Sequence, residues 1–152
     1  MERETLMNGF VLDTSVVLKW FSEYGEGDLN CALQIRESLL EGSAHFTVPE
    51  LLFYELGNAL RYNPHFSPRE VSEAIDSVFD MGMDVARIDK KVMKDAVALA
   101  FKYQITVYDA YFLGLSHTEE KPLITADYKF FEKVKGYKGI IKLSEFRSSS
   151  SD

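Results

Sequence analysis

The sequence contains one cysteine, three histidines and no long apolar run, and each shortage excludes a class of protein. Cys31 has no second cysteine with which to form an internal disulfide, and its place on an expected helix favours a packed thiol without chemistry. His45, His65 and His117 lack the spacing of a zinc-ligand pair. No apolar stretch approaches the roughly 20 residues of a membrane span, and the first residues are charged. We therefore expect neither a transmembrane helix nor a secretory signal, and a cytoplasmic location.

Positive charge is also in short supply. The chain has 17 Lys and Arg residues against 24 Asp and Glu residues, which gives a net charge of −7. Bulk electrostatic attraction would therefore not hold a nucleic acid. A polyanionic ligand would need local help from a divalent cation or from the lysine-rich C-terminal region, although an ordinary solvated face explains those lysines equally well. They are Lys129, Lys133, Lys135, Lys138 and Lys142.

The remaining composition is that of a single globular domain. With 152 residues, of which 46% are hydrophobic, the chain can fill one sizeable core. Segments with strand patterns alternate with segments of helical period, which predicts an α/β protein with a mainly parallel sheet covered on both faces. We assign residues 1–147 to this domain and expect the polar tail, residues 148–152, to be disordered.

The expected strands are Phe10–Leu12, Ala44–Val48, Met83–Ile88, Pro122–Thr125 and Gly139–Leu143. The expected helices are Thr14–Phe21, Leu29–Leu40, Pro49–Tyr62, one that begins at Pro68, one that runs from Asp89 to Tyr103, Ala110–Leu115 and Tyr128–Val134. Pro49 is assigned to the first helical position, where its missing N–H costs nothing. Ser67 and Glu70 form a capping box around Pro68, which is the clearest helix start in the chain.

The first expected strand ends abruptly at a carboxylate. Phe10 to Leu12 is apolar, and Asp13 and two hydroxyl residues follow it directly. In open α/β sheets ligands bind outside the carboxyl ends of the strands, so Asp13 is placed where chemistry is usually carried out. The same pattern recurs at Thr125 and Asp127, which would place both aspartates on one edge of the sheet. Either aspartate could instead cap the helix that follows it, and for Asp13 alone capping is the better explanation.

Two further carboxylates lie in apolar surroundings. Asp109 is flanked by apolar and aromatic residues, so we expect it to be partly desolvated and to need a partner. Glu55 lies in the middle of the Pro49–Tyr62 helix, where no backbone N–H is free, so capping cannot explain it. Because most of that helix is apolar, we expect Glu55 to turn inward to the same edge of the sheet, with Asn58 as a polar neighbour.

Four carboxylates on one edge, without clustered Lys or Arg, would repel one another unless a divalent cation lay between them. A ligand set made only of oxygen atoms selects hard cations, so the residues favour Mg²⁺ or Mn²⁺ over Zn²⁺.

Four segments of the chain, taken in order, resemble the PIN-domain ribonucleases. They are Val11–Val16, Val48–Leu51 followed by Glu55 and Asn58, Tyr108–Tyr111, and Ile124–Asp127. The order and spacing match from about Gly9 to Leu143. Within that superfamily, Asp13 to Trp20 is most similar to the VapC-type toxins of prokaryotic toxin–antitoxin pairs.

The resemblance implies an α/β/α sandwich, cleavage of RNA phosphodiester bonds and a small antitoxin as partner. It also implies a Mg²⁺ or Mn²⁺ site, and its residues are Asp13, Glu55, Asp109 and Asp127, with polar support from Ser15 and Thr125. We expect Asp13 and Asp109 to be direct ligands, and Glu55 and Asp127 to hold a second metal or to position the attacking water. Tyr128 and Lys129 stand where some members carry a further acid, which leaves one or two metals open.

A homodimer is predicted from apolar residues that exceed the needs of one small core. These are Leu52, Phe53 and Tyr54 on one expected helix, and Val78, Phe79, Met81 and Met83 around the end of another.

Two other functions compete with the nuclease. A phosphatase with an aspartyl nucleophile also carries Asp at the end of its first strand, but it needs a second Asp two residues on, where this chain has Ser15. A catalytically silent PIN-like fold could serve as an RNA-binding or protein-interaction module, and the intact acidic quartet argues against it.

Overall fold

The protein is seen in a computed structural model that describes residues 9–21 and 28–147. Five strands in this part of the chain form one sheet in the order β3-β2-β1-β4-β5, and every neighbouring pair is parallel. The strands are β1 (Gly9–Leu12), β2 (His45–Pro49), β3 (Asp84–Ala86), β4 (Leu123–Thr125) and β5 (Ile140–Lys142). The predicted strands are all present, and the sheet is wholly parallel rather than mainly so.

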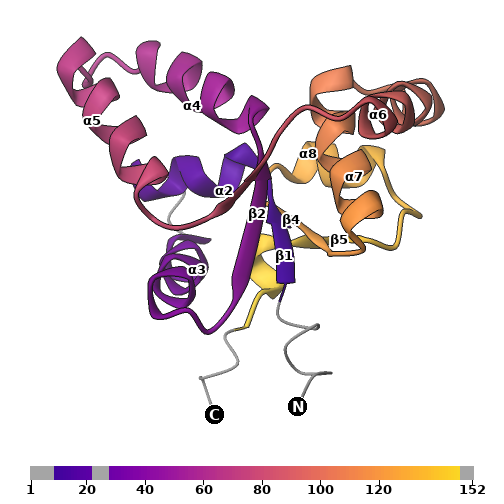
Figure 1. Ribbon diagram of the computed structural model, residues 1–152, viewed down its shortest axis with the longest axis horizontal. Coiled ribbons are helices and arrows are strands. Elements are labelled where there is room, and N and C mark those ends of the chain that lie inside the picture. The colour runs from indigo at the N-terminus through magenta and orange to yellow at the C-terminus, as the bar shows by residue number, and fades with distance from the viewer. Residues whose placement is uncertain (1–8, 22–27, 148–152) are drawn as a thin grey trace.

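Helices cover both faces of the sheet, so the fold is the predicted α/β/α sandwich (Figure 1). On one side lie α2 (Thr14–Leu18), the short helix η1 (Lys19–Phe21), α3 (Leu29–Glu41), α4 (Leu51–Arg61) and α5 (Pro68–Phe79). On the other lie α6 (Lys90–Tyr103), α7 (Val107–Glu119) and α8 (Tyr128–Lys133). A further short helix, η3 (Leu143–Glu145), follows β5. The predicted loop at 22–28 lies mostly outside the described residues, and the predicted tail lies wholly outside them.

The α7 helix is the inner helix of its layer. Its residues from Ala110 to Ser116 are all buried, and it packs against β1, β2 and β4. Its outer neighbour α6 comes close at Gly114, where an added Cβ atom would lie 3.1 Å from the carbonyl oxygen of Val92. The apolar stretch that predicted a helix buried within a layer is therefore confirmed, and the glycine permits the contact.

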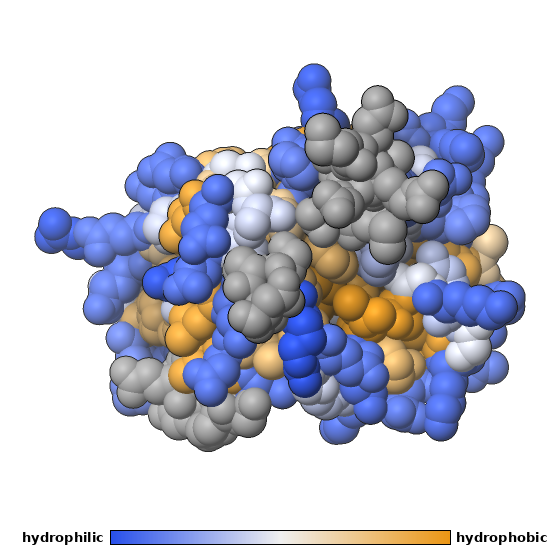
Figure 2. All heavy atoms as spheres, turned by 90° about the horizontal axis from the view of Figure 1, so that it is seen from below, coloured by the Kyte–Doolittle hydropathy of each residue, from blue (hydrophilic) through white to orange (hydrophobic). Residues whose placement is uncertain are grey.

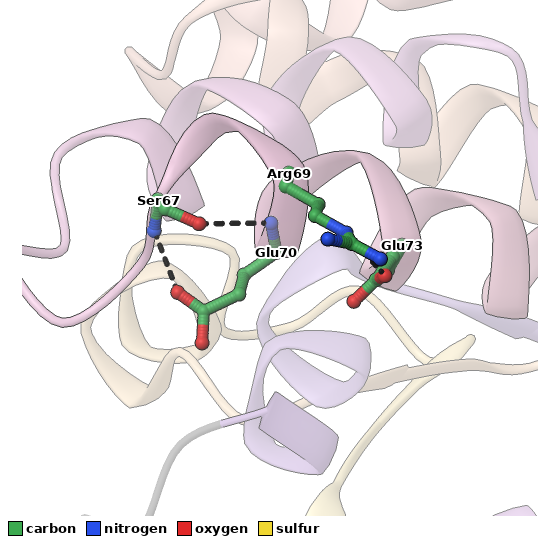
Figure 3. A network of polar contacts seen from close by, with 4 residues as sticks. All are labelled: Ser67, Arg69, Glu70 and Glu73. Atoms are coloured by element: carbon green, nitrogen blue, oxygen red, sulfur yellow. Dashed lines mark hydrogen bonds and ion pairs between the residues drawn. The ribbon is translucent and has the colours of Figure 1, made fainter.

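Two helix starts can be compared with their sequence signals. At α5 the capping box is complete: the amide of Glu70 donates to Ser67 Oγ at 3.2 Å, and the amide of Ser67 donates to Glu70 Oε1 at 2.8 Å (Figure 3). The assignment of Pro49 to the first turn of α4 was wrong, because Pro49 ends β2 and the helix begins at Leu51. The pairing of β2 with β1 stops at Thr47, so the missing N–H of Pro49 removes no hydrogen bond on that side.

The predicted excess of exposed apolar residues is only partly present. Val78 and Met83 are buried in the core, and Phe53 is half-buried and stacks on Phe79 with ring centroids 4.0 Å apart. Tyr54 and Phe79 are exposed, at 77% and 58%. Helical period alone could not show which of these side chains a neighbouring helix covers.

Seen from the amino-terminal edge of the sheet, hydrophilic side chains dominate the outline, and apolar residues are visible between them (Figure 2). Within the described ranges, no helix combines the length and the hydropathy that crossing a bilayer requires.

Candidate active site

Asp13 is buried at the carboxyl end of β1, with only 6% of its surface exposed. Its carboxylate makes no capping hydrogen bond to α2, although it occupies the N-cap position. Instead, Oδ2 accepts hydrogen bonds from Ser15 Oγ at 2.6 Å and from Thr125 Oγ1 at 2.9 Å. The capping explanation therefore fails for this residue, and two hydroxyl groups hold its carboxylate in place.

The same two hydroxyl groups join the ends of β1 and β4. Ser15 Oγ accepts a hydrogen bond from the amide of Ala126 at 2.9 Å, and Thr125 Oγ1 accepts one from the amide of Asp127 at 3.0 Å. Each hydroxyl thus accepts a hydrogen bond from a backbone amide and donates one to the Asp13 carboxylate. Through these hydrogen bonds Ser15 and Thr125 hold the Asp13 carboxylate against the backbone that follows β4.

Glu55 projects from α4 toward the same edge of the sheet. It is half-buried, and its Oε1 accepts a hydrogen bond from Thr14 Oγ1 at 2.6 Å. Asn58, the expected polar neighbour, is exposed. Sequence reasoning assigned no role to Thr14, and the only signal for it was a hydroxyl group directly after Asp13.

Asp109 lies in the first turn of α7 and is half-buried. It is not the helix cap, because its own amide donates to Thr106 Oγ1 at 3.0 Å. Asp127 differs, since its side chain is exposed and its Oδ1 accepts a hydrogen bond from the amide of Phe130 at 3.1 Å. The capping explanation therefore holds for Asp127, which leaves its second oxygen for another role.

The carboxylates influence one another electrostatically. The pKa of Asp13 is raised to about 6, chiefly by burial and to a smaller extent by the charges of Asp109 and Glu55, while the hydrogen bonds from Ser15 and Thr125 oppose the rise. Burial and the charge of Asp109 likewise raise the pKa of Glu55. Burial and the charge of Asp127 raise the pKa of Asp109, while the ammonium group of Lys133 opposes that rise. The charge of Asp109 is thus coupled to each of the other three carboxylates, and Lys133 is the basic neighbour that sequence reasoning did not place there.

The donor chemistry of this edge fits a hard divalent cation. Its donors are carboxylate and hydroxyl oxygens, and a cation would offset both the burial cost and the mutual repulsion that raise the three pKa values. In the described part of the chain, no three acidic, histidine or cysteine side chains stand close enough together to enclose an ion. An open arrangement of this kind is compatible with Mg²⁺, which keeps several waters and needs only one or two protein carboxylates.

An apolar cavity of about 370 Å³ lies between α4 on one side and α6 and α7 on the other, and Tyr54 and Tyr108 of its lining directly precede Glu55 and Asp109 in the sequence. Its lining residues are Glu50, Leu51, Tyr54, Ile88, Met93, Val107, Tyr108 and Tyr111. Two hydrogen bonds fix the segment before α6 that forms one wall: the amide of Ile88 donates to Glu50 Oε1, and the amide of Asp89 donates to Tyr111 Oη.

The model of the PIN domain family matches residues 10–137, which is most of the chain and includes all four carboxylates. The chain belongs to the PIN domain family. The PIN fold is also found in solved structures of low sequence identity, while no curated protein matches the chain. The family and the sandwich fold predicted from the sequence are thus confirmed.

Three solved structures illustrate the likeness of this PIN domain to toxin–antitoxin proteins. A toxin–antitoxin complex from Klebsiella pneumoniae is 18% identical with a TM-score of 0.65, over 88% of this chain and 96% of that one. DNA-bound VapBC from Salmonella typhimurium is 16% identical with a TM-score of 0.66, over 90% and 99%. A sarcin-ricin loop cleaving toxin from Mycobacterium tuberculosis is 13% identical with a TM-score of 0.61, over 81% and 93%.

Proposed function

We propose that this PIN domain is a metal-dependent endoribonuclease that hydrolyses RNA phosphodiester bonds. The observation that carries the proposal is a buried Asp13, held by two hydroxyl groups and coupled electrostatically to Glu55 and Asp109, with Asp127 coupled in turn to Asp109. A buried carboxylate among other carboxylates is costly for the fold, and such costs are concentrated at functional sites. The sarcin-ricin loop cleaving toxin among the structural neighbours supports RNA as the substrate class.

The proposed roles are those expected from the sequence. Asp13 and Asp109 would hold a Mg²⁺ or Mn²⁺ ion, and Glu55 and Asp127 would hold a second ion or orient the attacking water. When bound, the ion supplies positive charge that polarises a phosphoryl oxygen and acidifies water. Ser15 and Thr125 keep the Asp13 carboxylate in one orientation through their hydrogen bonds. Hydrolysis by water in line with the leaving ribose oxygen would yield a 5′-phosphate and a 3′-hydroxyl.

The nuclease proposal is tested by comparing wild type with Asp109→Asn. RNA cleavage and melting temperature are measured for both proteins, once in EDTA and once in millimolar Mn²⁺. Wild type should cleave a pool of structured RNAs in Mg²⁺ or Mn²⁺, lose cleavage in EDTA, and melt at a higher temperature with Mn²⁺. The variant should lose cleavage and most of the Mn²⁺-dependent rise in melting temperature, because it lacks one ligand charge. Cleavage by wild type in EDTA would contradict the proposal. RNA binding by wild type with no cleavage in any metal would favour a silent RNA-binding module instead.

We also propose that the chain is the toxin of a toxin–antitoxin pair. Toxin–antitoxin complexes among the structural neighbours support this, as does the acidic edge itself. An Arg or Lys on an antitoxin tail could reach that edge, because a bidentate Arg–carboxylate pair suits a cluster of carboxylates. Pull-down from the native host should recover a small basic-tailed protein, and recovery of none would contradict the pairing.

A homodimer is the third proposal, with the apolar cavity as its contact face. Tyr54, Ile88 and Tyr108 line that cavity and are 77%, 72% and 63% exposed. Exposed apolar side chains that gather in one place on a small protein mark an interaction surface. A second copy suits this face better than a nucleic acid does, because the lining brings no cation for phosphates and the neighbouring edge is acidic.

A further inference from the structure

Thr14 makes a hydrogen bond that helix formation does not require. It is the first residue of α2, and its hydroxyl donates to Glu55 Oε1 at 2.6 Å, across 41 residues of sequence. Only 6% of Thr14 is exposed, so water does not compete freely for this hydrogen bond. The contact joins the start of α2 to the middle of α4.

The polar side chains at the start of α2 make hydrogen bonds with side chains of the acidic edge and not with the backbone of the helix. Asp13 occupies the N-cap position without a capping hydrogen bond, and its carboxylate faces Ser15 and Thr125. Thr14 Oγ1 donates to Glu55 and makes no other hydrogen bond within the described residues. A helix start normally uses such side chains to bind its free amides, so this arrangement favours the acidic edge at the expense of the helix.

Resting on the proposed function, we propose that Thr14 is the positioning residue of Glu55. The hydroxyl group restrains the orientation of the half-buried carboxylate through Oε1, and the remaining lone pairs of Glu55 are left for the ion or for the attacking water. Each of the two inward-facing carboxylates, Asp13 and Glu55, then has its own hydroxyl support. Hydrogen-bond partners that orient ligands are worth about 10- to 100-fold in metal affinity or activity.

The test compares Thr14→Val, which removes the hydroxyl at constant shape, with Thr14→Ser, which keeps it. Thr14→Ala serves as a second hydroxyl deletion should the valine variant not fold. Thr47→Val is the matched control, because Thr47 is also buried and its hydroxyl accepts from Lys121 Nζ rather than donating to a carboxylate. For each protein, the melting temperature is measured over a Mn²⁺ titration, and RNA cleavage is measured beside it.

In Thr14→Val, the Mn²⁺ concentration that gives half of the maximal rise in melting temperature should increase about tenfold or more. The rate of RNA cleavage should fall by a similar factor. Thr14→Ser and Thr47→Val should follow wild type in both measurements. Equal Mn²⁺ dependence in Thr14→Val and Thr47→Val would overturn the positioning role, and so would a serine variant that behaves like the valine variant. If wild type itself shows neither a Mn²⁺ shift nor cleavage, it is the nuclease proposal that fails.

Discussion

At the scale of single residues, Asp13 carries a charge where burial opposes it. In the folded protein its pKa is about 6, against 3.8 in an exposed chain. Folding raises the pKa of this acid, so the folded state favours its protonated form. The free energy of unfolding is therefore highest, as far as Asp13 is concerned, below pH 3.8, and it falls as the pH rises through about 6. The metal-free protein at pH 7 therefore bears a cost of about 3 kcal/mol at this one carboxylate.

Asp13→Asn should remove that cost. Its amide oxygen can still accept from Ser15 and Thr125, so the metal-free variant should be more stable than wild type at pH 7, by up to about 3 kcal/mol. Its stability should also change less between pH 4 and pH 7. Urea unfolding in EDTA at both pH values measures this.

The control for Asp13→Asn is Asp89→Asn. Asp89 caps α6 through the amide of Val92, and Asn and Asp cap about equally well, so this variant should change little. A loss of stability in Asp13→Asn at pH 7 would mean that the carboxylate stabilises the metal-free fold.

How far single residues could be predicted depends on what surrounds them. The end of an apolar strand placed Asp13 and Asp127 correctly, but sequence could not show that Asp13 leaves α2 uncapped while Asp127 caps α8. That difference depends on which hydroxyl groups the neighbouring strand supplies. Thr14 was missed for the same reason, because its partner Glu55 is 41 residues away.

At the scale of helices and strands, local sequence signals predicted that an element exists better than they predicted the residues at which it begins and ends. The capping box before α5 is formed by adjacent residues, so the sequence contains all of it. The end of β2 depends on where its pairing with β1 stops, which no local pattern shows, and Pro49 was therefore assigned to the wrong element. The third strand is three residues long at the edge of the sheet, shorter than the Met83–Ile88 predicted.

Ser67→Ala should destabilise the protein by about 1 kcal/mol, because it leaves the amide of Glu70 without its side-chain acceptor. Ser72→Ala is the matched control: Ser72 is exposed within α5, where alanine is the better helix former, so stability should be equal or slightly higher. Chemical denaturation of both variants measures the difference. Equal stabilities would mean that the capping box contributes nothing to the fold.

At the scale of the whole molecule, the order of the strands explains the site. Because β1 and β4 are adjacent and parallel, the residues after them, Asp13 and Asp127, reach the same edge although 114 positions separate them in the sequence. The helical layers on the two sides of the sheet then contribute Glu55 from α4 and Asp109 from α7 (Figure 1). The shared edge of Asp13 and Asp127 could be predicted from the alternation of strands and helices. The apolar cavity could not be predicted, because it depends on which side chains remain uncovered between α4 on one side and α6 and α7 on the other.

The apolar cavity makes the proposed homodimer testable. If it is the contact face of a homodimer, Tyr108→Glu should yield a monomer, because it places a charge within an apolar interface that already lies beside an acidic edge. Phe101→Glu is the matched control: Phe101 is 83% exposed on α6 but does not line the cavity. Light scattering at micromolar concentration should show a dimer for wild type and Phe101→Glu, and a monomer for Tyr108→Glu. A monomeric wild type would contradict the dimer, and a dimeric Tyr108→Glu would place its contact on another face.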